Sequence, residues 1–164
     1  MWYHDLCQRS WKNCLFVAGE NMGNIIKSNA LCVGELMRAN GLQKPVIYCS
    51  PDSHVLSCAV PLNIQLAQRL VTIEPSRRSM RLEGRLVEIL NALPENAIIC
   101  DFDVLFHPKY EVDVLKVLIA ACKRRPFSVV WPGKYAGGRL YYAEEGLPDY
   151  AVFNISDYDV TCVI

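Results

Sequence analysis

The sequence predicts a single α/β domain, residues 1–164, with a mostly parallel central sheet flanked by helices, and three observations support this prediction. Short apolar runs that end at turn residues alternate with segments of helical periodicity through the first 131 residues. Parallel strands need long crossover connections of this kind, which are usually helices. The length of 164 residues suits one domain, and the last thirty residues are typical of an antiparallel extension.

The predicted strands of the central sheet are apolar runs, as expected for parallel strands buried on both faces. They span residues 14–18, 45–49, 97–102 and 127–131. Because the runs 14–18 and 97–102 are both apolar enough to be buried on two faces, we expect Asp101 at the C-terminal end of a central parallel strand beside the strand 14–18. Three later segments, 139–143, 150–155 and 160–164, are assigned to the antiparallel extension. The run 61–66 is too short for periodicity to distinguish a strand from the start of a helix, and both alternatives stay open.

Three segments carry apolar residues at helical spacing, namely 27–39, 76–93 and 112–122. Asn40-Gly41 and Pro94 follow the first two segments and are typical stop signals. The second segment places four arginines opposite its apolar face, Arg77, Arg78, Arg81 and Arg85. A solvated helix face explains these arginines better than contact with a nucleic-acid backbone does.

Charge and composition exclude several classes of protein. Lysine plus arginine number 17 and aspartate plus glutamate also number 17, so no overall field draws the protein onto DNA, and any contact with DNA would have to be local. Neither a secretory signal nor an apolar stretch of bilayer length is visible, which predicts a cytoplasmic protein outside the membrane. The eight cysteines include no C-x-x-C pair and are interpreted as reduced, mostly buried thiols.

The segment 19–28 has the components of a phosphate-binding loop. Gly19 and Gly23 would let backbone amides surround an anion, Lys27 would neutralise it, and the Ser28 hydroxyl would reach Mg²⁺. The spacing differs from G-x-x-x-x-G-K-[ST], because three residues separate Gly23 from Lys27 and two of them are isoleucines. An ordinary strand-to-helix turn is therefore an equal alternative.

A second motif resembles Walker B, in which an apolar strand ends in a metal-binding carboxylate. Ile98-Ile99-Cys100 precedes Asp101, which would hold Mg²⁺ directly or through water. Phe102 occupies the position where many ATPases have a glutamate that polarises water, so Asp103 is the nearest catalytic substitute. The alternative is an acidic residue that simply ends a buried strand.

From Pro61 onward the chain resembles the small P-loop F protein of bacteriophage-exclusion (BREX) defence systems, the BrxF family. The resemblance covers about a hundred residues and is most specific near the C-terminus. It rests on LNIQLAQRL (62–70), IICD (98–101), VLFHP (104–108), VWPG (130–133), GGRL (137–140) and YAEEGLPDY (142–150). It implies a P-loop NTPase-like fold, binding of ATP and Mg²⁺, and work alongside a large ATPase and a DNA methyltransferase.

The resemblance places Lys27 and Ser28 at the phosphates and Asp101 at the metal, but this chain departs from the regular phosphate loop of the family. Two functions follow from that departure. The first is a Mg²⁺-ATP-binding defence component that hydrolyses ATP slowly or not at all, because both motifs are altered. The second is a degenerate pseudo-NTPase that serves as a protein-interaction subunit of the defence complex.

Arg124 and Arg125 follow the predicted helix 112–122 and have two interpretations. They are either solvated residues that complement the helix dipole or arginine fingers that complete the site of a neighbouring subunit in a homo-oligomer. The solvated interpretation is favoured, because a site at the strand tips would lie at the opposite edge of the sheet.

Overall fold

The computed structural model describes residues 15–17, 23–27 and 44–164, and all elements named below lie in these ranges. The strands are β1 Leu15–Val17, β2 Asn24–Lys27, β3 Val46–Tyr48, β4 Ala59–Pro61, β5 Ile98–Cys100, β6 Ser128–Val130, β7 Lys134–Ala136, β8 Arg139–Tyr142, β9 Ala151–Asn154 and β10 Thr161–Val163. The α-helices are α2 Ser53–Cys58, α3 Asn63–Val71, α4 Arg78–Asn91 and α5 Val114–Arg124. The 3₁₀ helices are η2 Pro75–Arg77, η3 Asp103–Phe106, η4 Pro108–Tyr110 and η5 Ile155–Asp157.

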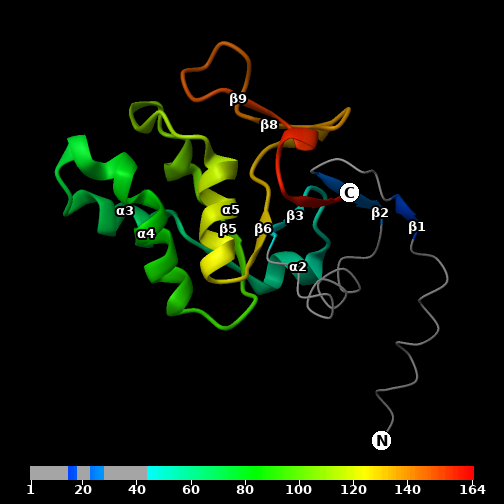
Figure 1. The fold of residues 1–164 in the computed structure, drawn as a ribbon, viewed down its shortest axis with the longest axis horizontal. Helices are drawn as coiled ribbons and strands as arrows, with labels where there is room; N and C mark the ends of the chain where they lie inside the picture. Colours follow the sequence, from blue (N-terminus) through cyan, green and yellow to red (C-terminus); the bar gives the residue numbers. More distant parts are fainter. Residues whose placement is uncertain (1–14, 18–22, 28–43) are drawn as a thin grey trace, which may run out of the picture.

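The central sheet has the strand order β1-β2-β10-β3-β6-β5-β4. Every pairing from β2 to β4 is parallel, whereas β1 pairs antiparallel with β2 at one edge. Helices α3, α4 and α5 lie beside this sheet (Figure 1). The predicted α/β fold with a mostly parallel sheet and flanking helices is therefore confirmed.

The C-terminal strand departs from the prediction, which placed residues 160–164 in the antiparallel extension. β10 lies inside the central sheet and pairs in parallel with both β2 and β3. Thr161, Cys162 and Val163 are all buried, which suits a short interior strand covered on both faces. Although β10 is close in sequence to the antiparallel strands, it does not pair with them.

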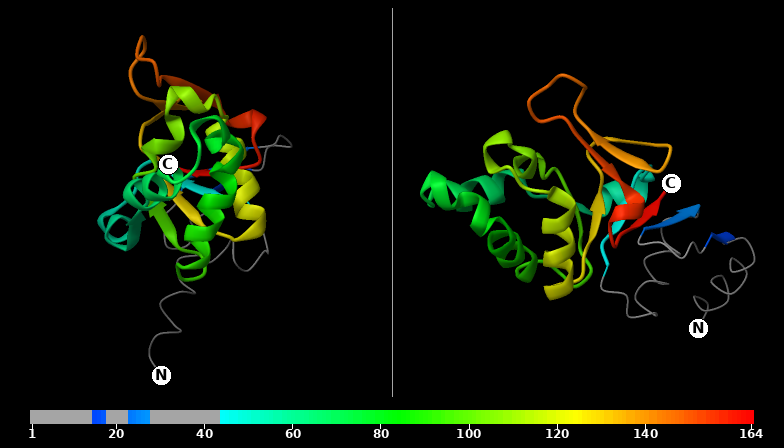
Figure 2. Two further views of the ribbon diagram at one scale, coloured as in Figure 1. Left: turned by 90° about the vertical axis from the view of Figure 1, so that its left-hand side faces the viewer. Right: turned by 45° about the horizontal axis from the view of Figure 1, so that its top comes forward.

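A second, three-stranded sheet β7-β8-β9 forms the antiparallel extension. Gly137 and Gly138 make the turn between β7 and β8 with φ angles of 53° and 77°, which glycine adopts without steric cost. Figure 2 shows this sheet as a separate layer beside the central sheet. Aromatic rings join the layers: the ring centroid of Trp131 lies 5.7 Å from that of Phe106 and 5.7 Å from that of Phe153.

The helices bury one apolar face each. α4 and α5 confirm the helical periodicity, and Asp113 begins α5 by accepting a hydrogen bond from the Lys116 amide at 3.1 Å. The run 61–66 proves to be the end of β4 and the start of α3. The predicted helix 27–39 lies, apart from Lys27, outside the described residues. No helix in the described part of the chain has the length and apolar character needed to cross a bilayer.

Candidate functional site

Asp101 directly follows the interior strand β5, at the C-terminal edge of the parallel sheet, as the sequence predicted. The residue is exposed, and its φ of 47° lies in the left-handed region that aspartate adopts more readily than most residues. The amide of Leu62 donates a hydrogen bond to the Asp101 carbonyl oxygen at 3.2 Å and ties this turn to α3. Asp101 thus lies at the edge where open α/β sheets bind ligands.

The strand predicted beside Asp101 is elsewhere. β1 was expected next to β5 as a buried parallel strand, but it is antiparallel and lies at the far edge of the sheet. The strands β2, β10, β3 and β6 separate the two, which corresponds to roughly 24 Å at the usual strand spacing. The prediction was wrong because an apolar run predicts a strand but does not show which strands lie beside it.

The segment predicted as a phosphate loop contains a strand. Residues Asn24–Lys27 form β2, and the two isoleucines within it favour extended backbone. Gly19 and Ser28 lie outside the described residues, while Gly23 packs so closely on Ile155 that an added Cβ would overlap the Ile155 carbonyl oxygen. The expectation of a loop entering a helix is therefore wrong for residues 24–27.

Lys27 and Asp101 do not meet at one site. Lys27 is the last residue of β2 and Asp101 follows β5, but β10, β3 and β6 lie between these two parallel strands. Four strand spacings correspond to roughly 19 Å between the two backbone positions. One phosphate group and its metal ion cannot contact both positions, so the pairing of Lys27 with Asp101 that the resemblance implies is not formed.

β3 lies at the topological switch point of the sheet. The chain runs from β3 towards the β4 edge, whereas it runs from β6 in the opposite direction to β10, so the switch point is at the C-terminal ends of β3 and β6. Open α/β sheets bind ligands at such a point. The residues after β3 are Cys49, Ser50, Pro51 and Asp52, with neither glycine nor lysine among them. Sequence reasoning recognised this strand but missed its central place.

Asp52 places a negative charge after the C-terminal end of β3. Its side chain accepts a hydrogen bond from the Val55 amide at 2.8 Å and thereby caps α2. A carboxylate at this helix start occupies the backbone amide that an anion would otherwise use, and it repels phosphate. The described residues that follow β3 therefore lack the features of a phosphate-binding loop.

Asp103 is the centre of a hydrogen-bond network that joins three distant parts of the sequence. Asn63 Nδ2 donates to Asp103 Oδ2 at 2.9 Å, and the Tyr142 hydroxyl donates to Asp103 Oδ1 at 2.9 Å. Asn63 Oδ1 in turn accepts from the Val104 amide at 3.0 Å. Burial and the Asp103 carboxylate raise the pKa of the Tyr142 phenol, which keeps it protonated as a donor.

A cleft of about 500 Å³ opens beside this network. Its lining combines acidic, aromatic and proline side chains, among them Asp103, Phe106, His107, Tyr142, Pro148 and Asp149. Tyr142 stacks on Phe106 with ring centroids 3.6 Å apart, so one wall of the cleft is a rigid aromatic pair. With two carboxylates and one histidine, the cleft suits a cationic or hydrogen-bond-donating group better than a phosphate.

Arg124 and Arg125 are held within their own subunit. Arg124 Nη1 lies 3.5 Å from Glu83 Oε1, and Arg125 Nη2 donates to the Leu93 carbonyl oxygen at 2.8 Å. Arg124 is the last residue of α5 and Arg125 follows it, and both precede β6, so they lie at the N-terminal edge of the parallel sheet. This placement supports their interpretation as residues of a helix end.

Removing the Asp103 carboxylate should destabilise the fold. We expect Asp103→Ala to lower the free energy of unfolding by about 2 kcal/mol, because two donors to a charged acceptor lose their partner. Urea denaturation followed by circular dichroism measures this change. Asp149→Ala is the matched control, since Asp149 lines the same cleft without a hydrogen bond to another described residue. Equal losses in both variants would contradict a bonding role for Asp103.

Comparison of this chain with models of protein families, with curated proteins and with solved structures finds no match.

Proposed function

We propose that this protein is a component of a bacterial anti-phage defence system of the BREX kind, in which it serves as a protein-interaction subunit on a P-loop-like α/β scaffold. The observation that favours an interaction role over nucleotide binding is the separation of Lys27 from Asp101 by four strand spacings. A protein that has kept the scaffold but lost the phosphate loop is a pseudo-NTPase. Its function then lies in its surfaces.

The resemblance to the defence family supports the same conclusion from another side. Asn63, Asp103 and Tyr142 belong to, or directly adjoin, three of the resembling segments, and hydrogen bonds bring them together. Segments of one resemblance that meet at one place indicate a common structural requirement there. We infer that the Asp103 network and its cleft belong to the working part of the molecule.

Binding of ATP and Mg²⁺ is the second candidate function, and the placement of Asp101 favours it. An exposed carboxylate at the C-terminal end of an interior parallel strand is where a Mg²⁺-nucleotide is held in related architectures. Asp103 would not replace a catalytic glutamate easily, because both of its carboxylate oxygens already accept hydrogen bonds. Under this candidate, hydrolysis is slow or absent.

Nucleotide binding separates the two candidates. As an interaction subunit, the protein should bind ATP with Mg²⁺ no more tightly than a dissociation constant of about 1 mM, measured by isothermal titration calorimetry. Asp101→Asn should then titrate like the wild type. Saturable binding at least tenfold tighter than that limit, abolished by Asp101→Asn and retained by Asp103→Asn, would establish the second candidate instead.

The interaction role is tested directly by co-expression. We expect the tagged chain to co-purify with the large ATPase or the DNA methyltransferase of the same defence system. Asp103→Asn is the test variant, because it preserves the shape of the side chain and removes its charge, and it should reduce the co-purification. Lys123→Glu is the control, because it alters an exposed position at the end of α5, and it should leave the co-purification unchanged. Recovery of neither protein, with the tagged chain folded, would refute the proposal.

A further inference from the structure

The end of the molecule formed by α3 and α4 exposes large apolar side chains. Ile64 is 74% exposed, Val71 is 69% exposed and Met80 is 76% exposed. Ile64 and Val71 are seven residues apart on α3 and therefore share a helix face. Val71 and Met80 lie on either side of the α3–α4 connection. We call the surface of Ile64, Val71, Arg77, Met80 and Arg81 the basic tip.

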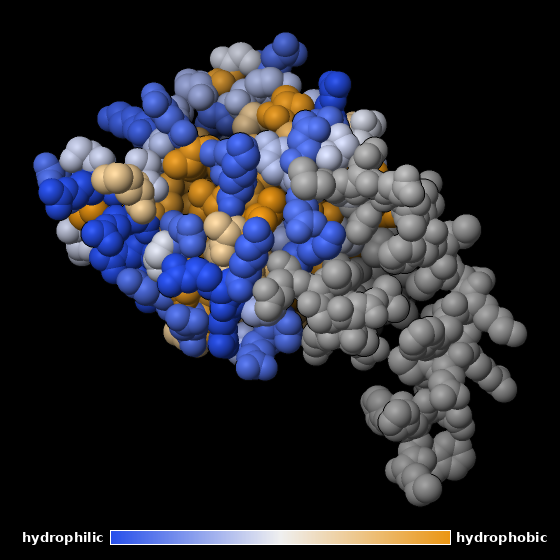
Figure 3. All heavy atoms as spheres, in the orientation of Figure 1, coloured by the Kyte–Doolittle hydropathy of each residue, from blue (hydrophilic) through white to orange (hydrophobic). Residues whose placement is uncertain are grey.

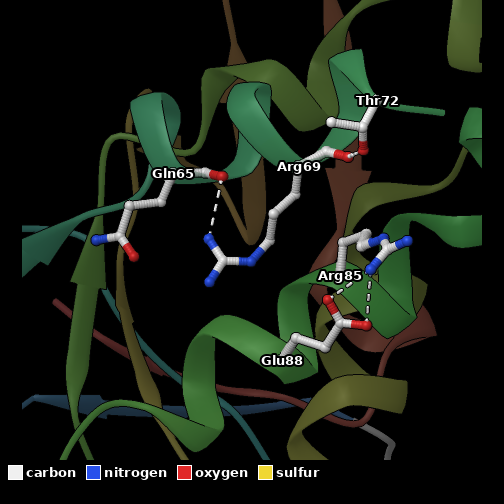
Figure 4. A network of polar contacts seen from close by, with 5 residues as sticks. All are labelled: Gln65, Arg69, Thr72, Arg85 and Glu88. Carbon is white, nitrogen blue, oxygen red and sulfur yellow. Dashed lines mark hydrogen bonds and ion pairs between the residues drawn. The ribbon is translucent and has the colours of Figure 1, made fainter.

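The basic tip contains Arg77 and Arg81 and belongs to a segment in which arginines outnumber acidic residues. Residues 63–91 contain five arginines and three glutamates, with no lysine or aspartate. The glutamates are already engaged: Glu74 with Arg77 at 3.9 Å, Glu88 with Arg85 at 2.8 Å, and Glu83 with Arg124 at 3.5 Å. In Figure 4, Arg85 donates to Glu88, whereas the guanidinium of Arg69 donates a hydrogen bond to the Gln65 carbonyl oxygen and forms no ion pair with a described carboxylate.

Arg81 is the most available of these charges. It is exposed, and no carboxylate among the described residues lies within ion-pair distance of it. Figure 3 shows hydrophilic residues over most of the α3–α4 end, with hydrophobic residues interleaved. The basic tip therefore combines positive charge with apolar side chains that solvent covers in the isolated subunit.

A surface of opposite character follows β8. The loop 143–150 carries Glu144, Glu145 and Asp149, and Leu147 within it is 50% exposed. Val152, at the start of β9, is 41% exposed. No described lysine or arginine forms an ion pair with these three carboxylates. We call Glu144, Glu145, Leu147, Asp149 and Val152 the acidic loop.

The two surfaces lie apart on one subunit, with the basic tip at the left-hand end of Figure 1 and the loop 143–150, in orange, at the top. We propose that the basic tip of one subunit docks on the acidic loop of a second copy of the chain. Both surfaces join apolar side chains to charges, and the charges are of opposite sign. A nucleic acid fits the basic tip less well, since Ile64, Val71 and Met80 have no counterpart in a phosphate backbone.

Such a contact is heterologous, because different surfaces of the two copies meet. Repetition therefore produces a ring or a filament rather than a closed dimer. Pro148 and Asp149 also line the cleft beside Asp103, so the docked copy would bring its arginines to the mouth of that cleft. This inference goes beyond the proposed function, which concerns other defence proteins and not a second copy.

Sedimentation-velocity ultracentrifugation with exchanged charges tests the contact. We expect the wild type to self-associate as its concentration rises. The dissociation constant should be at least about tenfold higher in about 1 M salt than in about 0.1 M salt, where the Debye length is about 10 Å and charges are less screened. Arg77→Glu/Arg81→Glu and Glu144→Lys/Glu145→Lys should each remain monomeric alone. An equimolar mixture of the two should associate again, which also shows that both variants are folded.

Lys123→Glu serves as the control for charge reversal outside both surfaces and should associate like the wild type. A wild type that stays monomeric at about 0.1 M salt and at the highest concentration reached would overturn the inference. So would a mixture of the two reversed variants that does not associate. Binding of a duplex oligonucleotide that Arg77→Glu/Arg81→Glu abolishes, without any self-association, would assign the basic tip to nucleic acid instead.

Discussion

Phe102→Ala should lower the free energy of unfolding by about 3–5 kcal/mol, the cost of removing a fully buried phenyl group. Phe102 is 0% exposed, and its ring lies 6.1 Å from the Phe106 centroid and 6.4 Å from the Trp131 centroid. These rings connect the turn after β5 to the end of β6. Urea denaturation monitored by circular dichroism and by tryptophan fluorescence measures the loss.

Phe102→Leu is the matched control, because it keeps an apolar side chain of similar reach and should cost less than about 1.5 kcal/mol. Phe102→Glu should fail to fold, since an ionised group would be buried without a partner. A folded Phe102→Glu protein of near wild-type stability would contradict this account. Phe102 faces the interior, so the position that the resemblance to Walker B would assign to a water-polarising glutamate is a core position in this fold.

The sequence allowed the buried residues of helices and strands to be predicted. It did not allow the order of the strands in the sheet to be predicted. Helix α4 followed from the apolar spacing of residues such as Leu82, Leu86 and Leu90, all of which are buried. The strand before Asp101 followed from three apolar residues and an abrupt carboxylate. Neither sequence pattern predicts the order of the strands, because that order depends on pairing between residues far apart in the sequence. That is why β1 and β10 were misplaced while their extended character was recognised.

The Asp103 site shows the same limit for side chains. Asp103 was identified as a candidate only through its position two residues after Asp101, whereas Asn63 and Tyr142 carried no signal of their own. Their hydrogen bonds span 40 and 39 residues along the chain. The resemblance nevertheless contains an indirect signal, since the resembling segments include both Asn63 and Tyr142. Treating these segments as parts of one site would have predicted the network around Asp103.

Gly133→Ala should destabilise the protein by at least about 3 kcal/mol, which is large for the addition of one methyl group. A Cβ built on Gly133 would overlap the Tyr141 carbonyl oxygen and would approach Trp131 Nε1. That carbonyl accepts a hydrogen bond from Trp131 Nε1 at 2.9 Å, which joins the end of β6 to β8. Because the overlap is with backbone, it cannot be relieved by rotating a side chain.

Gly84→Ala provides the comparison, since the same chemical change has the opposite expected sign. Gly84 lies inside α4 with no heavy atom within 4 Å of an added Cβ, and alanine in a helix interior is more stable than glycine by about 0.5–1 kcal/mol. Thermal and urea denaturation of both variants in parallel would show that their free energies of unfolding change in opposite directions. If Gly133→Ala were as stable as the wild type, the close approach of β8 to the end of β6 would be wrong, and with it the wall of the cleft that Tyr142 forms beside Asp103.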